Sequence, residues 1–426
     1  MTAIDKKTSR QRVAIQLFDA AVASADPTKL VAQYLGNEPN SRIHVVGAGK
    51  ASASMALAVE QAWPNADICG LVITPYGTLT PTSKIELIEA RHPVPDEQGL
   101  VASRKILALA TQLGSDDTLL CLISGGGSAL MSMSAGSVTL AEKQQINKAL
   151  LSSGAAIDEM NCVRKHLSAI KGGRLALAAH PAKVITLAVS DVPGDDFSVI
   201  ASGPTVQDNT TAAQAMEILS RYKIETPESV KTLLNQAPRN TQGNDDVWAN
   251  TEAHMIATPQ QSLEAAAALA KSSGYHPLIL GDAIEGEARD VAKVMAAMTK
   301  QVCQYGQPAP APVALISGGE TTVTLRGKGG RGGRNGEFLL SFANEIGDNP
   351  RVTALACDTD GIDGSEDNAG AVWDSSVASA AAAKKLNSRT YLDNHDAYSF
   401  FEACDALVKT GPTFTNVNDF RVVLID

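Results

Sequence analysis

The chain has 426 residues, of which 44% are hydrophobic, 4% aromatic and 19% charged, and its formal net charge at pH 7 is −10. This length is too great for a single core, so two or three domains are expected, and the composition is typical of a packed globular protein rather than a disordered one. The negative charge argues against nucleic-acid binding by bulk attraction, which depends on Lys and Arg neutralising phosphates.

The sequence also argues against a membrane or secreted protein. No run of about 18 apolar residues appears, and Met1–Lys7 lacks the apolar core of a signal peptide. The cysteines are scattered without paired CxxC spacing, so we expect reduced core residues. We therefore predict a cytoplasmic protein with neither a nucleic-acid nor a membrane partner.

The first half of the chain alternates between two patterns. The segment from Arg10 to Tyr34 is amphipathic and predicts one or two helices with a break at Asp26-Pro27. The strands predicted after it are 43–46, 68–74, 85–90, 118–124 and 184–190, and the predicted helices are 51–62, 97–113, 141–152 and 156–170. Such alternation predicts an α/β fold with a doubly wound, mostly parallel sheet whose strands are buried on both faces.

A polar, turn-forming segment from 236 to 246 predicts the domain boundary. It divides the chain into an N-terminal α/β domain, 1–240, and a C-terminal α/β domain, 241–426. The elements predicted for the second domain are strands 253–257, 277–280, 313–317, 321–325, 351–357 and 422–425 and helices 261–272 and 288–304. Only three residues separate strand 313–317 from strand 321–325, so we expect this pair to form an antiparallel hairpin in a mixed sheet.

Two similar glycine turns follow apolar strands, one formed by Ser124, Gly125, Gly126, Gly127 and Ser128. The other is formed by Ser317, Gly318, Gly319 and Glu320. At the carboxyl end of a parallel strand, glycine lets an oxyanion approach free backbone amides. The first turn therefore predicts an anion site for a phosphate or a carboxylate. The alternative is that its glycines only turn the chain or fit a tight helix–strand contact.

The segment from Val46 to Ser52 also joins a predicted strand to a helix, and it contains Gly47, Gly49 and Lys50. It lacks the spacing of a Walker A motif, and Ser52 stands where a dinucleotide fingerprint needs glycine. A lysine at a helix N-terminus beside flexible backbone is well placed to bind a phosphate. An exposed lysine at the helix start is the alternative interpretation.

A basic helix face is predicted in the segment 160–174. Asn161, Arg164, Lys165 and Ser168 recur at helical spacing, and Lys171 follows. In an acidic protein this positive charge favours an anionic ligand, although a solvated helix face would have the same pattern.

Carboxylates follow two predicted strands, at Asp191 and Asp195 in the first half and at Asp360 in the second. The carboxyl end of a strand is where a Mg²⁺ ligand or a general base is expected, but Asp also starts turns and caps helices. The segment around Asp360 does not have the spacing of an EF-hand.

The segment 325–337 is rich in glycine and arginine and precedes an apolar helix. A match to GxGxxG within it is discounted, because low-complexity glycine produces such matches by chance. A glycine loop that brings Arg334 to the start of a helix suits a nucleotide phosphate better, since a guanidinium binds phosphoryl oxygens at two points.

Together these motifs resemble one family, the type II glycerate 2-kinases with a C-terminal MOFRL domain, some of which carry the older label hydroxypyruvate reductase. Any one match is weak, but nine in order over almost the whole chain are specific. They are 47–50, 92–96, 124–128, 161–174, 190–195, 317–320, 332–335, 358–363 and 410–419. Gly336 and Phe414 depart from the family, which usually carries Gln and Gly there, and this concerns substrate geometry more than reaction class.

The resemblance implies two α/β domains with the active site in the cleft between them, and transfer of the γ-phosphoryl group of ATP to the 2-hydroxyl of D-glycerate, with Mg²⁺ bridging phosphate oxygens. The catalytic residues it implies are Lys50, Arg334 and Asp191. Those for glycerate are Ser124, Gly125, Gly126, Gly127, Ser128, Asn161, Arg164 and Lys171. Those for ATP are Gly47, Gly49, Gly318, Gly319, Glu320, Gly332, Gly333 and Asn335. Candidate Mg²⁺ ligands are Asp191, Asp195 and Asp360.

Two other functions stay open on the sequence. A reductase that acts on hydroxypyruvate with NAD(P)H would need a dinucleotide fingerprint, which both partial matches lack. A non-catalytic sensor of small organic acids would keep the anion sites but would not need Lys50 and Arg334 together. A homodimer is compatible with the sequence, and the oligomeric state stays open.

Overall fold

The computed structural model describes residues 7–236, 241, 243–325, 327 and 329–426. The start of the chain, most of the segment 237–242 in the predicted boundary and residues 326 and 328 of the glycine-rich loop lie outside the described residues. The chain forms two compact units. Here the N-terminal unit is Pro27–Ile256, and the C-terminal unit is Ala257–Asp426 together with Met1–Asp26.

The N-terminal unit is built on a six-stranded sheet in the order β3-β2-β1-β4-β5-β6. Its strands are β1 (Ile43–Ala48), β2 (Ile68–Pro75), β3 (Ile85–Ala90), β4 (Thr118–Ile123), β5 (Lys183–Val189) and β6 (Thr251–Ala257). Neighbours from β3 to β5 pair in parallel, which confirms the predicted sheet. The apolar run from Leu119 to Ile123 is buried along its whole length, because helices cover both faces.

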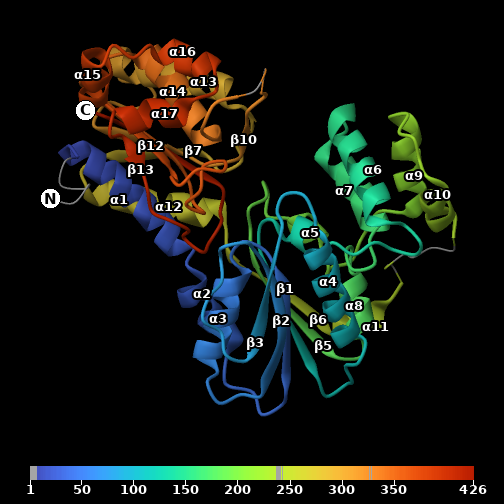
Figure 1. The fold of residues 1–426 in the computed structure, drawn as a ribbon. Coiled ribbons are helices and arrows are strands. Elements are labelled where there is room, and N and C mark those ends of the chain that lie inside the picture. Colours follow the sequence, from blue (N-terminus) through green and yellow to red (C-terminus); the bar gives the residue numbers. More distant parts are fainter. Residues whose placement is uncertain (1–6, 237–240, 242, 326, 328) are drawn as a thin grey trace. The chain divides into compact units, whose positions relative to one another are not determined.

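Helices α4 and α8 share a core with one face of this sheet, and α3 packs on β1, β2 and β4. Four further helices, α6, α7, α9 and α10, share a core of their own and stand together in Figure 1. The helices of the unit are α2 (Pro27–Leu35), α3 (Ser52–Ala62), α4 (Glu97–Ala110), α5 (Gly127–Leu130), α6 (Leu140–Ser153), α7 (Ile157–His166), α8 (Arg174–Ala179), α9 (Ala212–Arg221), α10 (Glu228–Asn235) and α11 (Asp245–Ala249), with the 3₁₀ turn η2 (Ile200–Ser202).

The C-terminal unit contains a mixed six-stranded sheet in the order β13-β12-β11-β14-β9-β7, which confirms the predicted mixed sheet, although not the hairpin from which it was predicted. Among the neighbouring strands described in this sheet, only β7 and β9 pair in parallel, and the other pairs are antiparallel. The strands are β7 (His276–Gly281), β9 (Val313–Ser317), β11 (Val352–Asp358), β12 (Gly370–Trp373), β13 (Leu407–Val408) and β14 (Asp419–Ile425), and a separate pair is formed by β8 (Gly286–Glu287) and β10 (Thr321–Thr322).

Helices cover both faces of this second sheet. One face shares a core with α1 (Ser9–Ser24) and α12 (Pro259–Ser272). The other face packs against α13 (Ala288–Tyr305), α14 (Arg334–Ile346), α15 (Ser375–Ala383), α16 (Ser388–Asp393) and α17 (Ala397–Ala403). No helix among the described residues has a stretch long and apolar enough to cross a bilayer.

The predicted hairpin between 313–317 and 321–325 is wrong. Strand β10 pairs in parallel with β8, and the edge of β9 that a hairpin would use is occupied by β14, with Arg421 opposite Ser317. Between β9 and β10, Gly319 lies so close to Ile284 that a Cβ would stand 2.2 Å from its carbonyl oxygen. The chain thus leaves β9 toward Ile284, and the last strand of the chain, β14, lies beside β9.

Strand β6, predicted to begin the second domain, pairs instead at the edge of the first sheet. The opening helix α1 belongs to the C-terminal unit, and the predicted break at Asp26-Pro27 is where the chain passes from that unit to the other. The compact units therefore divide the chain near residues 26 and 256, whereas the polar segment marked by composition lies within the N-terminal unit.

Candidate active site

The first glycine turn connects β4 to α5, and it is hydrogen-bonded to the backbone just before α3. Ser124 is fully buried, and its Oγ accepts a hydrogen bond from Ala51 N at 2.9 Å. The carbonyl of Gly125 accepts a hydrogen bond from Lys50 N, also at 2.9 Å. Ser124 and Gly125 therefore fix the backbone at Lys50, a role that the sequence did not predict for them.

The middle of the same turn lies beside the Lys50 side chain. Gly126 has φ +78°, and a Cβ on it would stand 3.0 Å from Cδ2 of His92 and 3.6 Å from Cγ of Lys50. On Gly127 a Cβ would stand 2.6 Å from the carbonyl oxygen of Ala48, at the end of β1. The turn, Lys50 and His92 thus meet at the carboxyl edge of the sheet, where ligands of parallel sheets bind.

Gly47 and Gly49 serve close packing of the chain on itself. A Cβ on Gly47 would stand 2.2 Å from the carbonyl oxygen of Leu122, and a Cβ on Gly49 would stand 2.1 Å from Oγ of Ser124. Ser52, at the position where a dinucleotide fingerprint needs glycine, is fully buried and donates from Oγ to Leu122 O at 3.1 Å. Both glycines are therefore explained by the tight approach of β1 and its turn to β4.

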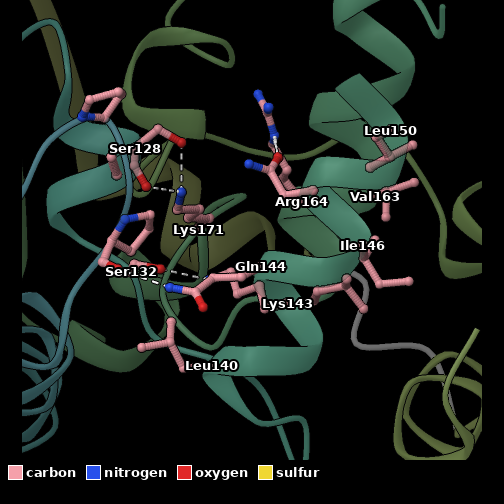
Figure 2. A pocket seen from close by; sticks show the side chains of 15 residues that line it. Ser128, Ser132, Leu140, Lys143, Gln144, Ile146, Leu150, Val163, Arg164 and Lys171 are labelled. Carbon is pink, nitrogen blue, oxygen red and sulfur yellow. Dashed lines mark hydrogen bonds between the residues drawn. The ribbon is translucent and has the colours of Figure 1, made fainter. Parts of the chain in front are cut away.

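A cavity of about 140 Å³ opens between α6, α7 and the first glycine turn (Figure 2). It contains three cationic side chains and no carboxylate among its lining residues, which are Pro93, Pro95, Ser128, Ala129, Ser132, Leu140, Lys143, Gln144, Ile146, Asn147, Leu150, Val163, Arg164, Leu167 and Lys171. We call it the cationic cavity. Of the residues predicted to bind substrate, Ser128, Arg164 and Lys171 line it.

Lys171 is almost fully buried and is aimed at the glycine turn. Its Nζ donates to the backbone oxygen of Ser128 and, at 2.6 Å, to the Ser128 Oγ. The Ser128 Oγ also lies 2.8 Å from the Ser202 Oγ. Figure 2 shows Lys171 and Ser128 on one side of the cavity and Arg164 on the helix opposite.

Helices α6 and α7 place the other two cations. Helix α6 begins with a capping box between Thr139 and Glu142, and the next residue is Lys143, whose Nζ donates to Ser132 Oγ at 3.2 Å. Arg164 lies in the last turn of α7, where positive charge complements the helix dipole. Its Nε donates to Asn147 Oδ1 at 2.7 Å.

The pKa values of the cationic side chains in the cavity are shifted by their burial and by the positive charge of their neighbours. Burial, and then the neighbouring Arg164, lower the pKa of Lys143 to about 8. Burial, and then Lys143 and Arg164, lower the pKa of Lys171 well below its usual range. Burial also lowers the pKa of Arg164. The free cavity therefore disfavours full protonation of its lysines, a penalty that an anion would relieve.

The basic helix face predicted from spacing is divided in the structure. Helix α7 ends at His166, and Lys165 turns away from the cavity to pair with the buried Asp208 at 3.4 Å. Asn161 does not line the cavity but accepts from Arg164 NH1 at 3.3 Å. Ser168, beyond the helix end, donates to Met133 O at 3.0 Å.

Sequence reasoning missed Lys143, Ser132 and Asn147, and it gave His92 no role in the site. Lys143 and Asn147 stand four residues apart on a helix that was predicted, and that spacing was the available signal. This signal carried little weight because Lys148 follows on the same helix and is exposed, so the pattern alone does not distinguish a cation that lines a cavity from a solvated one.

The carboxylates predicted to bind metal lie in both units. Asp191 and Asp195 follow β5 in the N-terminal unit, whereas Asp360 follows β11 in the C-terminal unit. Asp195 has φ +54°, and one of its carboxylate oxygens is buried without a hydrogen-bond partner. Among the described residues, no three His, Cys, Asp or Glu side chains are grouped in a way that could hold a metal ion. The chain therefore offers no ready-made cage for Mg²⁺ in that part of its structure.

Arg334 is the first residue of α14 and is surrounded by acids. Its Nε donates to Asp419 at 2.7 Å, NH1 to Glu320 at 2.8 Å and NH2 to Asp358 at 2.9 Å. Burial alone would lower the pKa of Arg334, but Asp419, Asp358 and Glu320 together raise it above its usual range. The guanidinium is therefore permanently charged and oriented by a different acceptor at each of its three nitrogens.

The start of α14 is fixed by a second buried carboxylate. Asp363 accepts from Asn335 N at 2.9 Å and from Gly336 N at 2.8 Å, which satisfies two free amides at the helix start. Burial raises the pKa of Asp363 to about 6, although the two backbone hydrogen bonds oppose the shift. The side chain of Asn335 is buried and donates to Asp419 at 2.7 Å, so it supports the partner of Arg334.

The other residues predicted to contact ATP divide into two groups. Gly318 and Gly319 are held against their own unit: Gly318 N donates to Gly281 O at 2.8 Å, and Gly319 lies against Ile284. Glu320, Gly332 and Gly333 line, with Arg334, a cavity of about 580 Å³ in the C-terminal unit.

Comparison with known proteins gives consistent matches. Residues 13–235 match a family described as "Domain of unknown function (DUF4147)", and residues 313–419 match the MOFRL family. A protein of Agrobacterium vitis named "Putative hydroxypyruvate reductase" is 52% identical over 98% of this chain and 95% of its own length. D-glycerate 2-kinase of Thermotoga maritima is 40% identical over 98% of this chain and 99% of its own length. A crystal structure of glycerate kinase from Thermotoga maritima has a TM-score of 0.87, with 39% sequence identity, and covers 98% of this chain and 100% of that one.

Proposed function

The chain belongs to the family of glycerate kinases that carry a MOFRL domain, and from this premise we propose that it is an ATP-dependent glycerate 2-kinase. Support comes from a relative named D-glycerate 2-kinase that is similar over almost the full length of both chains, and from the similarity in fold to a glycerate kinase. The proposed substrates are D-glycerate and ATP, and the products are 2-phosphoglycerate and ADP.

The proposed reaction is a direct phosphoryl transfer. The 2-hydroxyl oxygen of glycerate forms a bond to the γ-phosphorus of ATP, and the bond from that phosphorus to the β,γ-bridging oxygen breaks. The hydroxyl proton passes to a carboxylate, for which we propose Asp191 at the carboxyl end of β5. Such a transfer depends mainly on positioning and on neutralising phosphate charge, which suits a site built from lysine, arginine and backbone amides.

One observation carries the proposal for the N-terminal unit. A lysine at the start of a helix, Lys50, is hydrogen-bonded through its backbone to the first glycine turn, and Gly126 of that turn lies against the Lys50 side chain. A cation and free amides at the edge of a parallel sheet form an anion site. We propose that Lys50 stabilises the transferred phosphoryl group and that the glycine turn, through Gly126–Ser128, belongs to the glycerate site.

In the C-terminal unit, Arg334 is the proposed phosphate-binding residue. The acids that surround it keep the guanidinium charged and fix its plane, so it needs little reorganisation when charge develops on a phosphoryl oxygen. We propose that Glu320, Gly332 and Gly333, which line the same cavity, belong to the ATP site, and that Asn335 supports it through Asp419.

Mg²⁺ enters this proposal as part of the substrate, Mg-ATP. Proteins commonly hold Mg²⁺ through one or two carboxylates together with the phosphates of the nucleotide, rather than through a complete protein cage. The scattered carboxylates Asp191, Asp195 and Asp360 fit that limited role better than a preformed metal site, and Asp191 has in addition the proposed role of proton acceptor.

The second candidate function is a reductase that acts on hydroxypyruvate with NAD(P)H. It is favoured by the name of the Agrobacterium vitis relatives, which are 52% and 50% identical to this chain. The geometry of the turn between β1 and α3 opposes it, because Gly47 and Gly49 are in contact with β4 and Ser124, and Ser52 occupies the position that the dinucleotide fingerprint assigns to glycine.

The experiment that tests the proposal is a ³¹P NMR time course of the purified protein with Mg-ATP and D-glycerate, run beside an absorbance assay with NADH and hydroxypyruvate. We expect a 2-phosphoglycerate signal that grows together with ADP, and no oxidation of NADH. NADH oxidation without a phosphorylated product would reverse the ranking of the two functions. Replacement of Lys50 by Ala is expected to abolish turnover in a kinase, whereas in a sensor it would only weaken binding.

A further inference from the structure

We propose that the cationic cavity binds the carboxylate of the substrate acid, and that Lys143, Lys171 and Arg164 make the enzyme specific for an anionic acceptor. This inference rests on the proposed function and assigns the part of the substrate that does not react. It gives Lys143, which no motif singled out, a role in substrate binding.

The composition of the cavity indicates a small anion as its occupant. Lys143, Arg164 and Lys171 line it, and the described lining contains neither Asp nor Glu. Their polar partners there, Ser128, Ser132 and Asn147, are neutral. Lys171 is buried, and Lys143 and Arg164 are half-buried. Charges withdrawn from water are normally paired with opposite ones, so a cavity that groups three cations around neutral acceptors lacks its counter-charge.

The remaining lining explains why a short acid suits the cavity. Leu140, Ile146, Leu150, Val163 and Leu167 form an apolar wall, and the volume is about 140 Å³. An apolar wall lowers the local dielectric constant and so strengthens the attraction between a carboxylate and the cations. The same wall offers no partner for a second polar group, which favours a ligand whose other groups point out of the cavity.

The cavity is connected to the proposed reaction centre through three residues of the chain. Lys171 binds both the backbone oxygen and the Oγ of Ser128, and two residues earlier Gly126 lies against Cγ of Lys50. A carboxylate held by Lys171 would therefore anchor the substrate at the Ser128 end of the glycine turn, and Lys50 would lie near the Gly126 end of the same turn. An anchor of this kind orients the 2-hydroxyl, one carbon away from the carboxylate.

The lowered pKa values of the cavity lysines provide a measurable sign of carboxylate binding. Burial and neighbouring cations lower the pKa of Lys143 to about 8, and they lower the pKa of Lys171 well below its usual range. Arg164 is the other charged group that faces them in the cavity. A carboxylate stabilises the protonated lysines and raises their pKa, so substrate binding is expected to take up protons near pH 8. Above pH 8, apparent affinity is expected to fall as Lys143 loses its charge.

The first test compares variants on helix α6. In Lys143→Gln the KM for D-glycerate is expected to rise about 10- to 100-fold, the usual loss for one charge-assisted hydrogen bond, with a smaller change in kcat. Lys143→Arg, which keeps the charge, should recover part of the loss. The matched control is Lys148→Gln, which removes an exposed lysine from the same helix and should leave KM unchanged. Equal KM values for Lys143→Gln and Lys148→Gln, in proteins with unchanged melting temperatures, would overturn the inference.

The second test measures proton uptake by the wild-type protein. Titration calorimetry of D-glycerate into protein saturated with Mg²⁺ and a non-hydrolysable ATP analogue is run at pH 8 in two buffers of different ionisation enthalpy. A difference in observed enthalpy that corresponds to proton uptake, and that shrinks in Lys143→Gln, supports the inference. Binding with no proton uptake contradicts it.

These measurements separate the inference from the proposed function. If the wild-type protein makes 2-phosphoglycerate but Lys143→Gln has normal KM and proton uptake, the kinase proposal stands and the cavity assignment fails. If no phosphorylated product forms, yet D-glycerate binds with proton uptake that depends on Lys143, the cavity assignment stands and the kinase proposal fails.

Discussion

The two units hold their candidate anion-binding cations in opposite ways. In the N-terminal unit, Lys143, Arg164 and Lys171 line one cavity without a carboxylate. In the C-terminal unit, Arg334 donates to Asp419, Glu320 and Asp358, and the buried Arg421 donates to Asp419 as well. The first arrangement has too little negative charge, and the second has more acids than cations at its centre.

This difference indicates two kinds of binding. The cationic cavity is electrostatically strained until an anion arrives, which favours a ligand that stays bound through the reaction, such as the substrate carboxylate. The charge of Arg334 is already balanced by acids and its plane is fixed, so it contributes direction more than net charge, which favours a group whose charge changes only in the transition state. The five predictions that follow test this contrast.

The largest effect is expected for Arg334→Ala. The side chains of Asp419 and Asp358 are 0% and 5% exposed, and both would lose the cation they share, although Asp419 keeps its bonds to Arg421 and Asn335. Removing one partner from a buried ion pair typically costs about 3 to 5 kcal/mol in the free energy of unfolding, and loss of a transition-state donor lowers kcat about 100- to 1000-fold. Urea unfolding and the ³¹P assay measure these two changes.

The control for that variant is Arg331→Ala. Arg331 lies on the same glycine-rich loop, but its side chain is 52% exposed, and its partners are Glu366, Glu402 and the ring of Tyr398. Contacts of an exposed cation contribute about 0 to 1 kcal/mol each, so this variant should lose clearly less stability than Arg334→Ala. If both variants unfold at the same urea concentration, the acids around Arg334 do not depend on it as proposed.

A somewhat smaller loss is expected for Asp363→Ala, which leaves the Asn335 and Gly336 amides at the start of α14 without their acceptor. Two unsatisfied buried donors cost about 2 kcal/mol in the free energy of unfolding, and the helix that presents Arg334 would be displaced. Asp374→Ala is the matched control, because Asp374 is a buried cap of α15 away from Arg334. Both variants should lose stability in thermal melts, but only Asp363→Ala should lose turnover; equal kinetics would count against the positioning role.

Gly126→Ala tests the first glycine turn. Its φ of +78° makes any Cβ unfavourable by about 1 to 2 kcal/mol, and the new methyl group would also press against His92. In Gly154→Ala the φ of +77° imposes the same backbone strain, but nothing lies within 4 Å of the new Cβ. Similar melting temperatures with a loss of kcat only in Gly126→Ala would separate the contact with His92 and Lys50 from the strain.

A pH-dependent change in stability is expected from the cationic cavity. Because the pKa of Lys143 in the folded protein is lowered to about 8, the unfolded chain binds more protons between pH 8 and about 10. Stability without ligand should therefore rise with pH through this window and be lost as the pH falls through 8. In Lys143→Gln the slope of melting temperature against pH should be smaller. An unchanged slope would show that Lys143 does not titrate in this range.

The smallest effect is expected for Glu320→Gln. Glu320 is the most exposed partner of Arg334, with a side chain that is 49% exposed, whereas Asp419 is fully buried. Removing an exposed ionic partner should change the free energy of unfolding by less than about 1 kcal/mol. Urea unfolding of this variant, compared with that of Arg334→Ala, shows how much of the stabilisation around Arg334 comes from Glu320 and how much from the two buried acids. A loss as large as that of Arg334→Ala would mean that Glu320, and not the buried pair, holds the guanidinium.

The local character of the molecule could be predicted from the sequence. Continuous apolar runs such as Leu119–Ile123 indicate strands buried on both faces, and their alternation with helical stretches indicates a parallel sheet. Glycine between a strand and a helix indicated turns, and the turn that contains Gly126 does lie beside Lys50. These features depend on short segments whose residues are neighbours in the chain, so patterns of residue type are enough to find them.

The tertiary structure decided which distant groups meet. Strand β14 takes the edge of β9 that a hairpin would have used, and β6 joins the first sheet, because packing across long separations outweighs the length of a loop. Lys143 and Lys148 have the same chemistry on one helix, yet only Lys143 lines the cavity with Lys171. The charge environment of a side chain depends on burial and on neighbours from other elements, and the sequence by itself determines neither.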